Sequence, residues 1–292
     1  MASRTRLRVA VAGSTGYIGM QCTALLAQHP DVEVTRVMGR SHAGKRHGDV
    51  VPGSAVNLPI EHTLQPDSAD VVFAALPHTV AAQHARSWLS AGATVIDMSA
   101  DFRLHDAAAY RQWYRLEHPA PDLLDESVYA LVELHREALR GANLIAVPGC
   151  YPTATLLACA PALQQRLVEA DIVVDAKSGV SGAGRSPQLG TSFSEVNESV
   201  HAYGVSGHRH KSEMLEQLEA AAGGDVHLTF VPHLIPMTRG ILVTAYLRPR
   251  DAVSVDAIAN SYRALSEENP FVLYTDSPPA TKMVTGTNLA VI

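Results

Sequence analysis

The sequence predicts an α/β protein in which a Rossmann-type, doubly wound parallel sheet precedes a second α+β domain with a mixed, largely antiparallel sheet. Three observations support this class. A strand, a glycine turn and a helix follow one another over residues 8–27, strands and helices then alternate to residue 97, and apolar strands return after residue 226. We expect the boundary at Gly149, with one domain over residues 1–149 and the other over residues 150–292.

The composition is that of an ordinary folded protein. With 292 residues, 47% of them hydrophobic and 18% charged, the chain is long enough for two domains that bury roughly 75% of the unfolded surface. A net charge of −6 argues against nucleic acid as a partner. Three cysteines give no disulfide framework and are typical of the cytoplasm. The sequence predicts neither a signal peptide nor a membrane-spanning segment.

A glycine turn follows the first predicted strand, residues 8–12. In this setting Gly13 makes the tight turn, Gly16 lets the backbone approach a pyrophosphate, and Gly19 allows close packing of the helix on the strand. A purely structural turn is the competing interpretation, because the spacing is GxxGxxG and not GxGxxG. The residues expected to bind a dinucleotide are Gly13, Ser14, Thr15, Gly16, Tyr17, Ile18 and Gly19.

The end of the second predicted strand, residues 32–38, indicates which dinucleotide is bound. An NAD-preferring site has an acidic residue there for the ribose hydroxyls, whereas this chain continues with Gly39, Arg40 and Ser41. A guanidinium and a hydroxyl suit a 2′-phosphate. We therefore expect NADP as the cofactor, with Arg40 and Ser41 in its site; a solvated basic loop is the alternative.

Two further apolar strands, residues 70–76 and 93–97, flank a helix expected from about Thr79 to Ala91. This repeat predicts a parallel sheet with helices on both faces and a ligand crevice at the carboxyl edge of its strands. Arg103 follows the fourth strand, so its guanidinium is a candidate for binding a phosphate. A surface ion pair is the competing interpretation.

A cysteine at the start of a helix is the central feature of the sequence. An apolar strand at residues 143–147 is broken by the motif PGCYPT, and a helical run follows. Cys150 then lies where backbone N–H groups and the helix dipole favour a thiolate. We interpret Cys150 as a nucleophile, whereas Cys22 and Cys159 lie within apolar helices and are expected to be buried.

The loop after the strand at residues 171–177 contains three glycines and ends in Arg185. Such a loop can bring backbone N–H groups to an anion. A flexible connection is the competing interpretation.

Histidines and a carboxylate open the next predicted helix. If this helix starts near Arg209, His210 and Glu213 lie on the same side of it, and the carboxylate can orient the imidazole. His208 is the alternative proton donor, because the sequence does not say which imidazole points inward. No metal is expected, since these residues lack the usual ligand spacing.

The rest of the second domain is predicted from apolar runs. Residues 226–230 and 240–247 look like antiparallel strands, and a helix is expected over residues 256–265. Two short strands, at residues 271–274 and from Met283 onward, complete the domain.

These segments together resemble the N-acetyl-gamma-glutamyl-phosphate reductase family, within the aspartate-semialdehyde dehydrogenase superfamily. The resemblance extends from near Val9 to the last residue. It rests on six motifs in order: GSTGYIG at 13–19, DMSADFR at 97–103, PGCYPT at 148–153, SGVSGAGR at 178–185, HRH at 208–210 and VPHLIPMTRG at 231–240. Ser212 stands where the family pattern has proline, and Leu131-Val132-Glu133 stands where it has Leu-Pro-Glu.

The resemblance implies an NADP-dependent enzyme of arginine biosynthesis that reduces an acyl phosphate to an aldehyde through a cysteine thioester. Residues 1–149 would be the NADP-binding domain and residues 150–292 the catalytic and dimerisation domain. The family also implies a homodimer or homotetramer. The implied roles are catalytic for Cys150, His210 and Glu213, substrate-binding for Arg103, Arg185 and His208, and cofactor-binding for Ser181 and Gly182.

Three alternatives stay open. A related reductase of lysine biosynthesis acts on a substrate carried by an acidic protein, which calls for a basic docking face that a net charge of −6 does not indicate. Aspartate-semialdehyde dehydrogenase fits the residues around Cys150 and His210 less closely. A catalytically silent NADP-binding protein is the third, because the sequence stops before the family's C-terminal helix, which packs near the nicotinamide.

Overall fold

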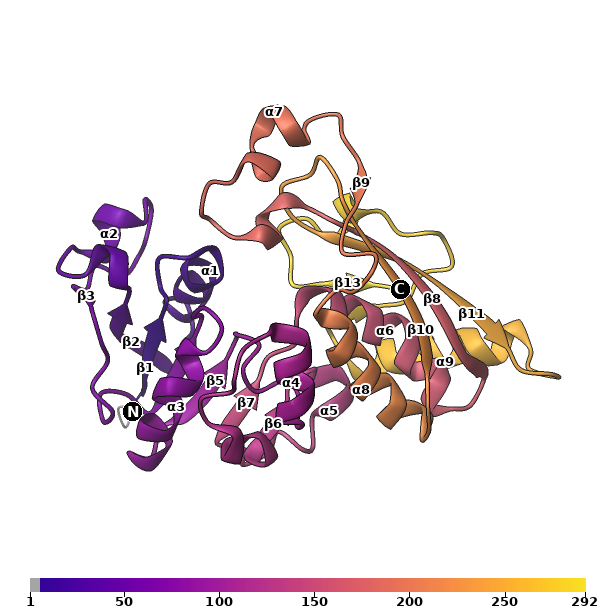
Figure 1. Cartoon of the computed structure of the whole chain (residues 1–292), viewed down its shortest axis with the longest axis horizontal. Helices are drawn as coiled ribbons and strands as arrows, with labels where there is room; N and C mark the ends of the chain where they lie inside the picture. The colour runs from indigo at the N-terminus through magenta and orange to yellow at the C-terminus, as the bar shows by residue number, and fades with distance from the viewer. Residues whose placement is uncertain (1–5) are drawn as a thin grey trace. The chain divides into compact units, whose positions relative to one another are not determined.

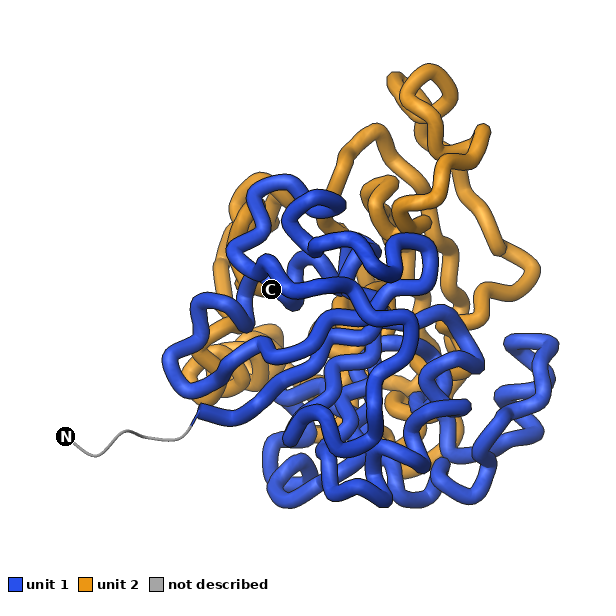
Figure 2. Tube along the Cα trace, turned by 90° about the vertical axis from the view of Figure 1, so that its left-hand side faces the viewer, with its two compact units in different colours: residues 1–148 blue, residues 149–292 orange. Residues whose placement is uncertain are grey.

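The computed structural model describes residues 6–292 and divides into two compact units, residues 1–148 and residues 149–292 (Figure 2). Unit 1 contains a seven-stranded sheet, and unit 2 contains a four-stranded sheet and a separate two-stranded one. The glycine turn lies in unit 1, and unit 2 begins one residue before Cys150.

Unit 1 is built on a seven-stranded parallel sheet with the strand order β3-β2-β1-β4-β5-β7-β6 (Figure 1). The chain moves from β1 outward to β2 and β3 and then returns to β4 on the other side of β1. A doubly wound sheet binds its ligand at such a reversal, beyond the carboxyl ends of the strands. The strands are β1 (Leu7–Ala12), β2 (Val32–Met38), β3 (Ile60–Glu61), β4 (Val71–Ala74), β5 (Thr94–Asp97), β6 (Ser127–Tyr129) and β7 (Leu144–Ala146).

Helices cover both faces of this sheet. Right-handed crossovers in opposite directions put α1, between β1 and β2, and α3, between β4 and β5, on opposite faces. Trp88 of α3 is 1% exposed and packs with a set of buried alanines, whose small side chains bring the helix close to the sheet. The predicted doubly wound fold is confirmed. The helical segments are α1 (Tyr17–Leu26), η1 (Arg40–His42), α2 (His47–Val50), α3 (Val80–Ser90), α4 (Ala107–Tyr114), η2 (Pro121–Glu126) and α5 (Val132–His135).

The start of α3 is fixed by a side chain from outside the helix. Thr79, which precedes the helix, has a left-handed φ of 69° and forms no cap with its own side chain. Asp101 accepts hydrogen bonds from the amides of Thr79 at 2.7 Å and Ala82 at 3.0 Å, and from the Tyr110 hydroxyl at 3.0 Å. This buried side chain therefore caps α3 and complements the positive end of its dipole.

Unit 2 contains a mixed four-stranded sheet with the order β11-β8-β10-β9. Its strands are β8 (Val168–Ser178), β9 (His201–Ala202), β10 (His227–Leu234) and β11 (Ile241–Pro249). β11 runs antiparallel to β8 and β9 antiparallel to β10, but β10 runs parallel to β8. The prediction of an antiparallel strand at residues 226–230 is thus wrong for its pairing with β8. The long crossover through α8 returns the chain in the same direction as β8, which a hairpin could not do.

The longer helices of unit 2, α6, α8 and α9, lie along one face of the sheet, whereas the short α7 lies apart from them (Figure 1). α6 packs on β8 and β11, α8 packs on β10 and on α6, and α9 packs on α6. No helix within residues 6–292 is both long enough and apolar enough to cross a bilayer. The helical segments are α6 (Cys150–Gln164), η3 (Val180–Ala183), η4 (Leu189–Thr191), α7 (Phe193–Val196), α8 (His210–Ala222), α9 (Val255–Glu268) and η5 (Thr281–Met283).

The C-terminal segment forms a separate pair of parallel strands, β12 (Val272–Leu273) and β13 (Ala290–Val291). The strand predicted from Met283 onward therefore begins later than expected. Residue 283 ends the 3-10 turn η5, and Gly286 has a φ of 76°, so the chain turns before it pairs.

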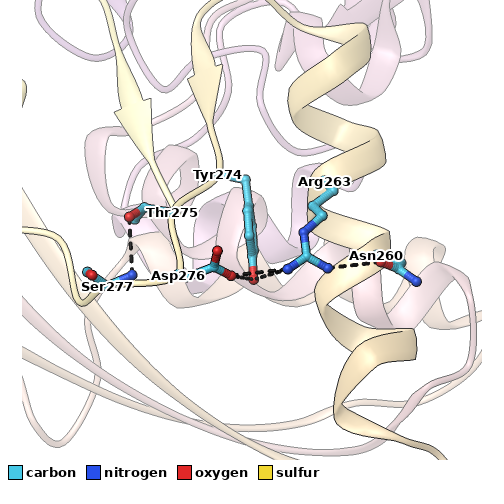
Figure 3. Close-up of polar contacts among 6 residues, drawn as sticks. All are labelled: Asn260, Arg263, Tyr274, Thr275, Asp276 and Ser277. Atoms are coloured by element: carbon cyan, nitrogen blue, oxygen red, sulfur yellow. Dashed lines mark hydrogen bonds and ion pairs between the residues drawn. The ribbon is translucent and has the colours of Figure 1, made fainter.

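A polar cluster attaches the segment after β12 to α9 (Figure 3). Arg263 of α9 donates to Asp276 Oδ1 at 3.1 Å and to Asn260 Oδ1 at 3.0 Å. Its guanidinium carbon lies 4.7 Å from the centre of the Tyr274 ring, and the Tyr274 hydroxyl donates to Asp276 at 2.9 Å. A cation–π contact combined with these hydrogen bonds is characteristic of arginine.

We predict that Gly13→Ala destabilises unit 1 much more than Gly92→Ala. Both glycines have positive φ values, 80° and 88°, so both substitutions introduce backbone strain. A Cβ at Gly13 would also lie 2.1 Å from the Ala75 carbonyl oxygen, whereas a Cβ at Gly92 would meet nothing within 4 Å. Chemical denaturation should give a difference of about 2 kcal/mol or more between the two variants. Equal losses would contradict this account of the turn.

Candidate functional site

The glycine turn connects β1 to α1 at the point where the strand order reverses. The Gly13 and Ser14 amides both donate to the Met38 carbonyl at 3.0 Å, and the Ser14 hydroxyl reaches the same oxygen at 3.2 Å. A Cβ on Gly19 would lie 2.1 Å from the Gly13 carbonyl oxygen. Gly13 and Gly19 are therefore required by the backbone itself, as the sequence predicts.

The presence of glycine at position 16 is not explained by the backbone or by packing. Its φ of −79° is open to any residue, and the nearest atom to a Cβ there would be the Gly13 carbonyl oxygen at an ordinary 3.6 Å. Packing therefore does not require glycine at this position, and the predicted close approach of a phosphate to Gly16 stays a prediction. α1 starts directly after Gly16, with neither a side-chain cap nor an acidic residue in its first turn. These residues fit a dinucleotide pyrophosphate.

The predicted 2′-phosphate residues lie at the end of β2. Arg40 and Ser41 are exposed and form the start of η1, immediately after Gly39. The pKa of His84 on α3 is lowered by burial and, to a lesser extent, by the positive charge of Arg40. The guanidinium of Arg40 is therefore close enough to α3 for its charge to act on His84.

Arg103 is buried at the carboxyl edge of the sheet, not in a surface ion pair. Its guanidinium donates to the carbonyls of Val147 at 2.8 Å and Met98 at 3.1 Å. Burial and the nearby Asp101 raise the pKa of Asp97 to about 7, although hydrogen bonds from Ser99 and the charge of Arg103 partly oppose this shift. The guanidinium is thus held in a fixed position among buried polar groups.

Cys150 is the first residue of α6, the position that the sequence predicts. Its side chain is exposed, whereas Cys22 and Cys159 are buried, and burial raises the pKa of each of these two thiols to about 12. Gly149 precedes the helix in an extended conformation without a side-chain cap. The exposed thiol at a helix N-terminus is therefore the candidate nucleophile.

Glu213 connects the start of α8 to the start of α6. It is fully buried in the first turn of α8, and its Oε1 accepts the Gly149 amide at 2.7 Å. The sequence did not predict this contact, because the two residues are 64 positions apart. The orientation of His210 by Glu213 stays a prediction, and both side chains lie buried in the same helical turn.

Aromatic rings surround the two histidines. The ring of His208 lies 4.9 Å from that of His210 and 5.5 Å from that of Tyr151, and its Nδ1 accepts the His210 amide at 3.2 Å. Burial and the neighbouring Arg209 lower the pKa of His208 to about 4. His208 is therefore neutral at pH 7, with the proton on Nε2.

Two tyrosines lie in this cluster that sequence reasoning missed. The Tyr151 and Tyr203 hydroxyl oxygens are 2.8 Å apart. Burial is the main cause of the raised pKa of each tyrosine, and electrostatic interaction with the nearby Cys150 adds to it. Tyr151 directly follows Cys150 in the PGCYPT motif, which is a signal that could have identified it. Tyr203 has no local sequence signal.

The glycine-rich loop is held by the chain before β11. The amides of Gly179, Val180 and Ser181 donate to carbonyls of the segment 237–240 at 2.8–3.0 Å. Gly182 lies in η3, and Arg185 is exposed just beyond it. The first amides of the loop are therefore engaged within the protein, and the predicted contacts of Ser181 and Gly182 with the cofactor remain predictions.

Comparison with known proteins assigns each half of the chain to a domain family. Residues 8–142 match the semialdehyde dehydrogenase NAD-binding domain, and residues 150–292 match the semialdehyde dehydrogenase dimerisation domain. The solved structure of aspartate semialdehyde dehydrogenase II from Vibrio cholerae has a TM-score of 0.73 at 15% identity, over 98% of this chain and 87% of that chain. The Candida albicans aspartate semialdehyde dehydrogenase with NADP has a TM-score of 0.68 at 14% identity, over 96% and 85%. The chain thus belongs to the class of two-domain proteins built from a semialdehyde dehydrogenase NAD-binding domain and a semialdehyde dehydrogenase dimerisation domain.

Sequence relatives are more specific. The N-acetyl-gamma-glutamyl-phosphate reductase of Dehalococcoides mccartyi, strain BAV1, is 45% identical over 289 residues, which cover 98% of this chain and 84% of the relative. The enzymes of the same name from Desulforudis audaxviator and Azotobacter vinelandii are 47% and 48% identical, over 97% of this chain and 84% of each relative. The chain belongs to the N-acetyl-gamma-glutamyl-phosphate reductase family.

We predict that His208 stays neutral from pH 8 down to about pH 5. Its pKa in the folded protein, about 4, is below the ordinary 6.5, so the unfolded chain binds a proton at this residue before the folded protein does. The free energy of unfolding should therefore decrease as the pH falls from 6.5 towards 4, with a contribution of up to about 1.4 kcal/mol per pH unit from this residue. NMR titration, with the His208 signal assigned from His208→Asn, measures the pKa. A midpoint near 6.5 would contradict the prediction.

Proposed function

We propose that this chain is an NADPH-dependent reductase that converts N-acetyl-gamma-glutamyl phosphate to N-acetyl-glutamate 5-semialdehyde in arginine biosynthesis. The observation that carries the proposal is the exposed thiol of Cys150 at the N-terminus of α6, with the buried His210 and Glu213 at the start of the adjacent α8. The reductases of the same family, at 44–48% identity, support the choice of this substrate.

In this proposal NADP binds to unit 1. The turn from Gly13 to Gly19 would bind the pyrophosphate, and Arg40 and Ser41 would bind the 2′-phosphate. Ser181 and Gly182 of unit 2 would add contacts to the cofactor. When bound, NADPH supplies the hydride that reduces the acyl carbon.

Cys150 starts the reaction. Its thiolate sulfur attacks the acyl carbon of the substrate, the carbon–oxygen bond to phosphate breaks, and inorganic phosphate leaves. The carbon–sulfur bond of the resulting thioester breaks only after reduction, when the thiohemiacetal collapses to the aldehyde and Cys150 is regenerated. Arg103 and Arg185 are proposed to bind the phosphate, because a guanidinium matches its geometry.

The first turn of α6 offers few amides for the oxyanion. The Gly149 amide donates to Glu213, and Pro152 has no N–H. The Thr153 amide donates to the Gly149 carbonyl at 2.9 Å. We propose that backbone N–H groups near Cys150, at the positive end of the helix dipole, stabilise the oxyanion.

His210 is the proposed acid. A group with a pKa of about 4 carries almost no proton at pH 7, so His208 is unsuited to donate one as the thiohemiacetal collapses. His208 would instead bind the substrate through Nε2–H, since its Nδ1 already accepts the His210 amide. Glu213, three residues after His210, would orient its imidazole.

We also propose an oligomeric state and a cellular location for the protein. The match of residues 150–292 to a dimerisation domain indicates an oligomer, and we propose a homodimer or homotetramer. A cytoplasmic location is proposed because all three cysteines carry thiols.

We predict that Cys150→Ser lowers kcat by on the order of a thousandfold or more, because an alcohol at this position is not ionised and does not form the thioester. The Kd for NADPH, measured by fluorescence titration, should stay within about twofold of the wild-type value, since unit 1 is unchanged. Cys159→Ala, in the same helix, is the matched control and should retain turnover, because that buried thiol has a pKa of about 12. Substantial turnover by Cys150→Ser would reject the assignment of the nucleophile.

We also predict that Arg40→Ala weakens NADPH binding by roughly tenfold or more while the Kd for NADH changes little, because only NADPH carries the 2′-phosphate. Arg36→Ala is the control, since Arg36 already pairs with Glu61 at 3.2 Å. Parallel titrations with both nucleotides measure the effect. Equal losses for NADH and NADPH would contradict the role of Arg40.

A further inference from the structure

His47 is a buried histidine that the proposed reaction does not use. It is the first residue of the short helix α2 and has no solvent exposure. Its Nε2 lies 3.2 Å from the carbonyl oxygen of Ser14, in the glycine turn, and its Nδ1 lies 2.9 Å from the Ser54 hydroxyl. The imidazole therefore connects the glycine turn to the loop that follows α2.

The partners of the ring determine where its proton lies. A carbonyl oxygen can only accept, so Nε2 must carry a hydrogen in order to bond to Ser14. In the neutral ring Nδ1 accepts the Ser54 hydroxyl. In a protonated ring Nδ1–H donates to that oxygen, and the hydroxyl can turn to the Val56 carbonyl, 3.0 Å away. The Nε2–H bond to Ser14 is present in both states.

This bond fixes the direction of one peptide plane. The Ser14 carbonyl and the Thr15 N–H belong to the same peptide unit, and in a trans peptide they point in opposite directions. With the carbonyl held towards the buried imidazole, the Thr15 N–H points away from His47. A flipped peptide would instead present a carbonyl oxygen in that direction, where it would repel a phosphate.

We infer that His47 is a positioning residue for the cofactor, which holds the Ser14–Thr15 peptide in the orientation that receives the pyrophosphate of NADPH. The inference rests on the cofactor part of the proposed function and not on the reductase chemistry. It is tested by binding alone, so a failure of the proposed turnover would be seen separately.

The decisive comparison uses His47→Leu and His47→Gln. Leucine removes the donor while filling similar space, and the glutamine side-chain amide retains an N–H donor of comparable reach. NADPH titration should give a Kd raised by roughly three- to twentyfold for His47→Leu, as expected for one lost hydrogen bond and a freed peptide. His47→Gln should recover most of that loss. His62→Leu, the same substitution at an exposed position, should leave the Kd unchanged.

Binding of a second ligand distinguishes a misplaced Ser14–Thr15 peptide from a general disruption of the cofactor site. Adenosine 2′-monophosphate carries the 2′-phosphate but no pyrophosphate, so His47→Leu should bind it as the wild type does. An unchanged NADPH affinity in His47→Leu, or equal losses for NADPH and adenosine 2′-monophosphate, would overturn the inference. If His47→Leu does not fold, Ser54→Ala decides the matter. It keeps the ring but removes the hydroxyl that holds it through Nδ1, so the imidazole is less firmly fixed against the Ser14 carbonyl and NADPH binding should weaken selectively; no selective loss would likewise overturn the inference.

Discussion

The hydrogen bond from the Gly149 amide to Glu213 Oε1 links the two helices that carry the proposed chemistry. It joins the residue directly before Cys150 to the first turn of α8, three residues after His210. A carboxylate that accepts a backbone N–H at a helix N-terminus forms one of the stronger hydrogen bonds in proteins, and burial strengthens it further. Loss of this bond would remove the hydrogen bond between the helix ends that carry the thiol and the imidazole, while α8 still packs on α6, and it would leave a buried amide without this acceptor.

In unit 1, hydrogen bonds from buried side chains likewise fix backbone groups at the carboxyl edge of the sheet. Asp101 caps α3 from a loop beyond the next strand, and His47 holds the Ser14 carbonyl from α2. In each case a buried polar side chain, distant in sequence, fixes backbone groups at a turn where a strand passes into a helix. The N–H groups of such turns are the usual means of binding anions, so their orientation determines what the site can bind.

Local signals allowed much of the fold and site to be predicted from sequence. The strand, glycine turn and helix around Gly13 and the placement of Cys150 at the start of α6 follow from glycine and proline positions within a few residues. The pairing of strands that are distant in the sequence could not be predicted. β10 runs parallel to β8, and nothing within residues 226–230 specifies that direction. The link between Glu213 and Gly149, the position of Tyr203 and the burial of His47 also depend on tertiary contacts. Arg103 was identified by its place after β5, but its bonds to Met98 and Val147 were not predictable.

In the proposed reaction Cys150 carries the acyl group from the release of phosphate to the reduction step. The most direct measurement mixes the protein with N-acetyl-glutamate 5-semialdehyde and NADP in the absence of phosphate, follows NADPH formation in stopped flow, and maps the acylated peptide by mass spectrometry. We expect a rapid burst of one NADPH per subunit, after which the reaction nearly stops, with the acyl group on the peptide that contains Cys150. The absence of a burst, or an acyl group on another residue, would contradict this role of Cys150.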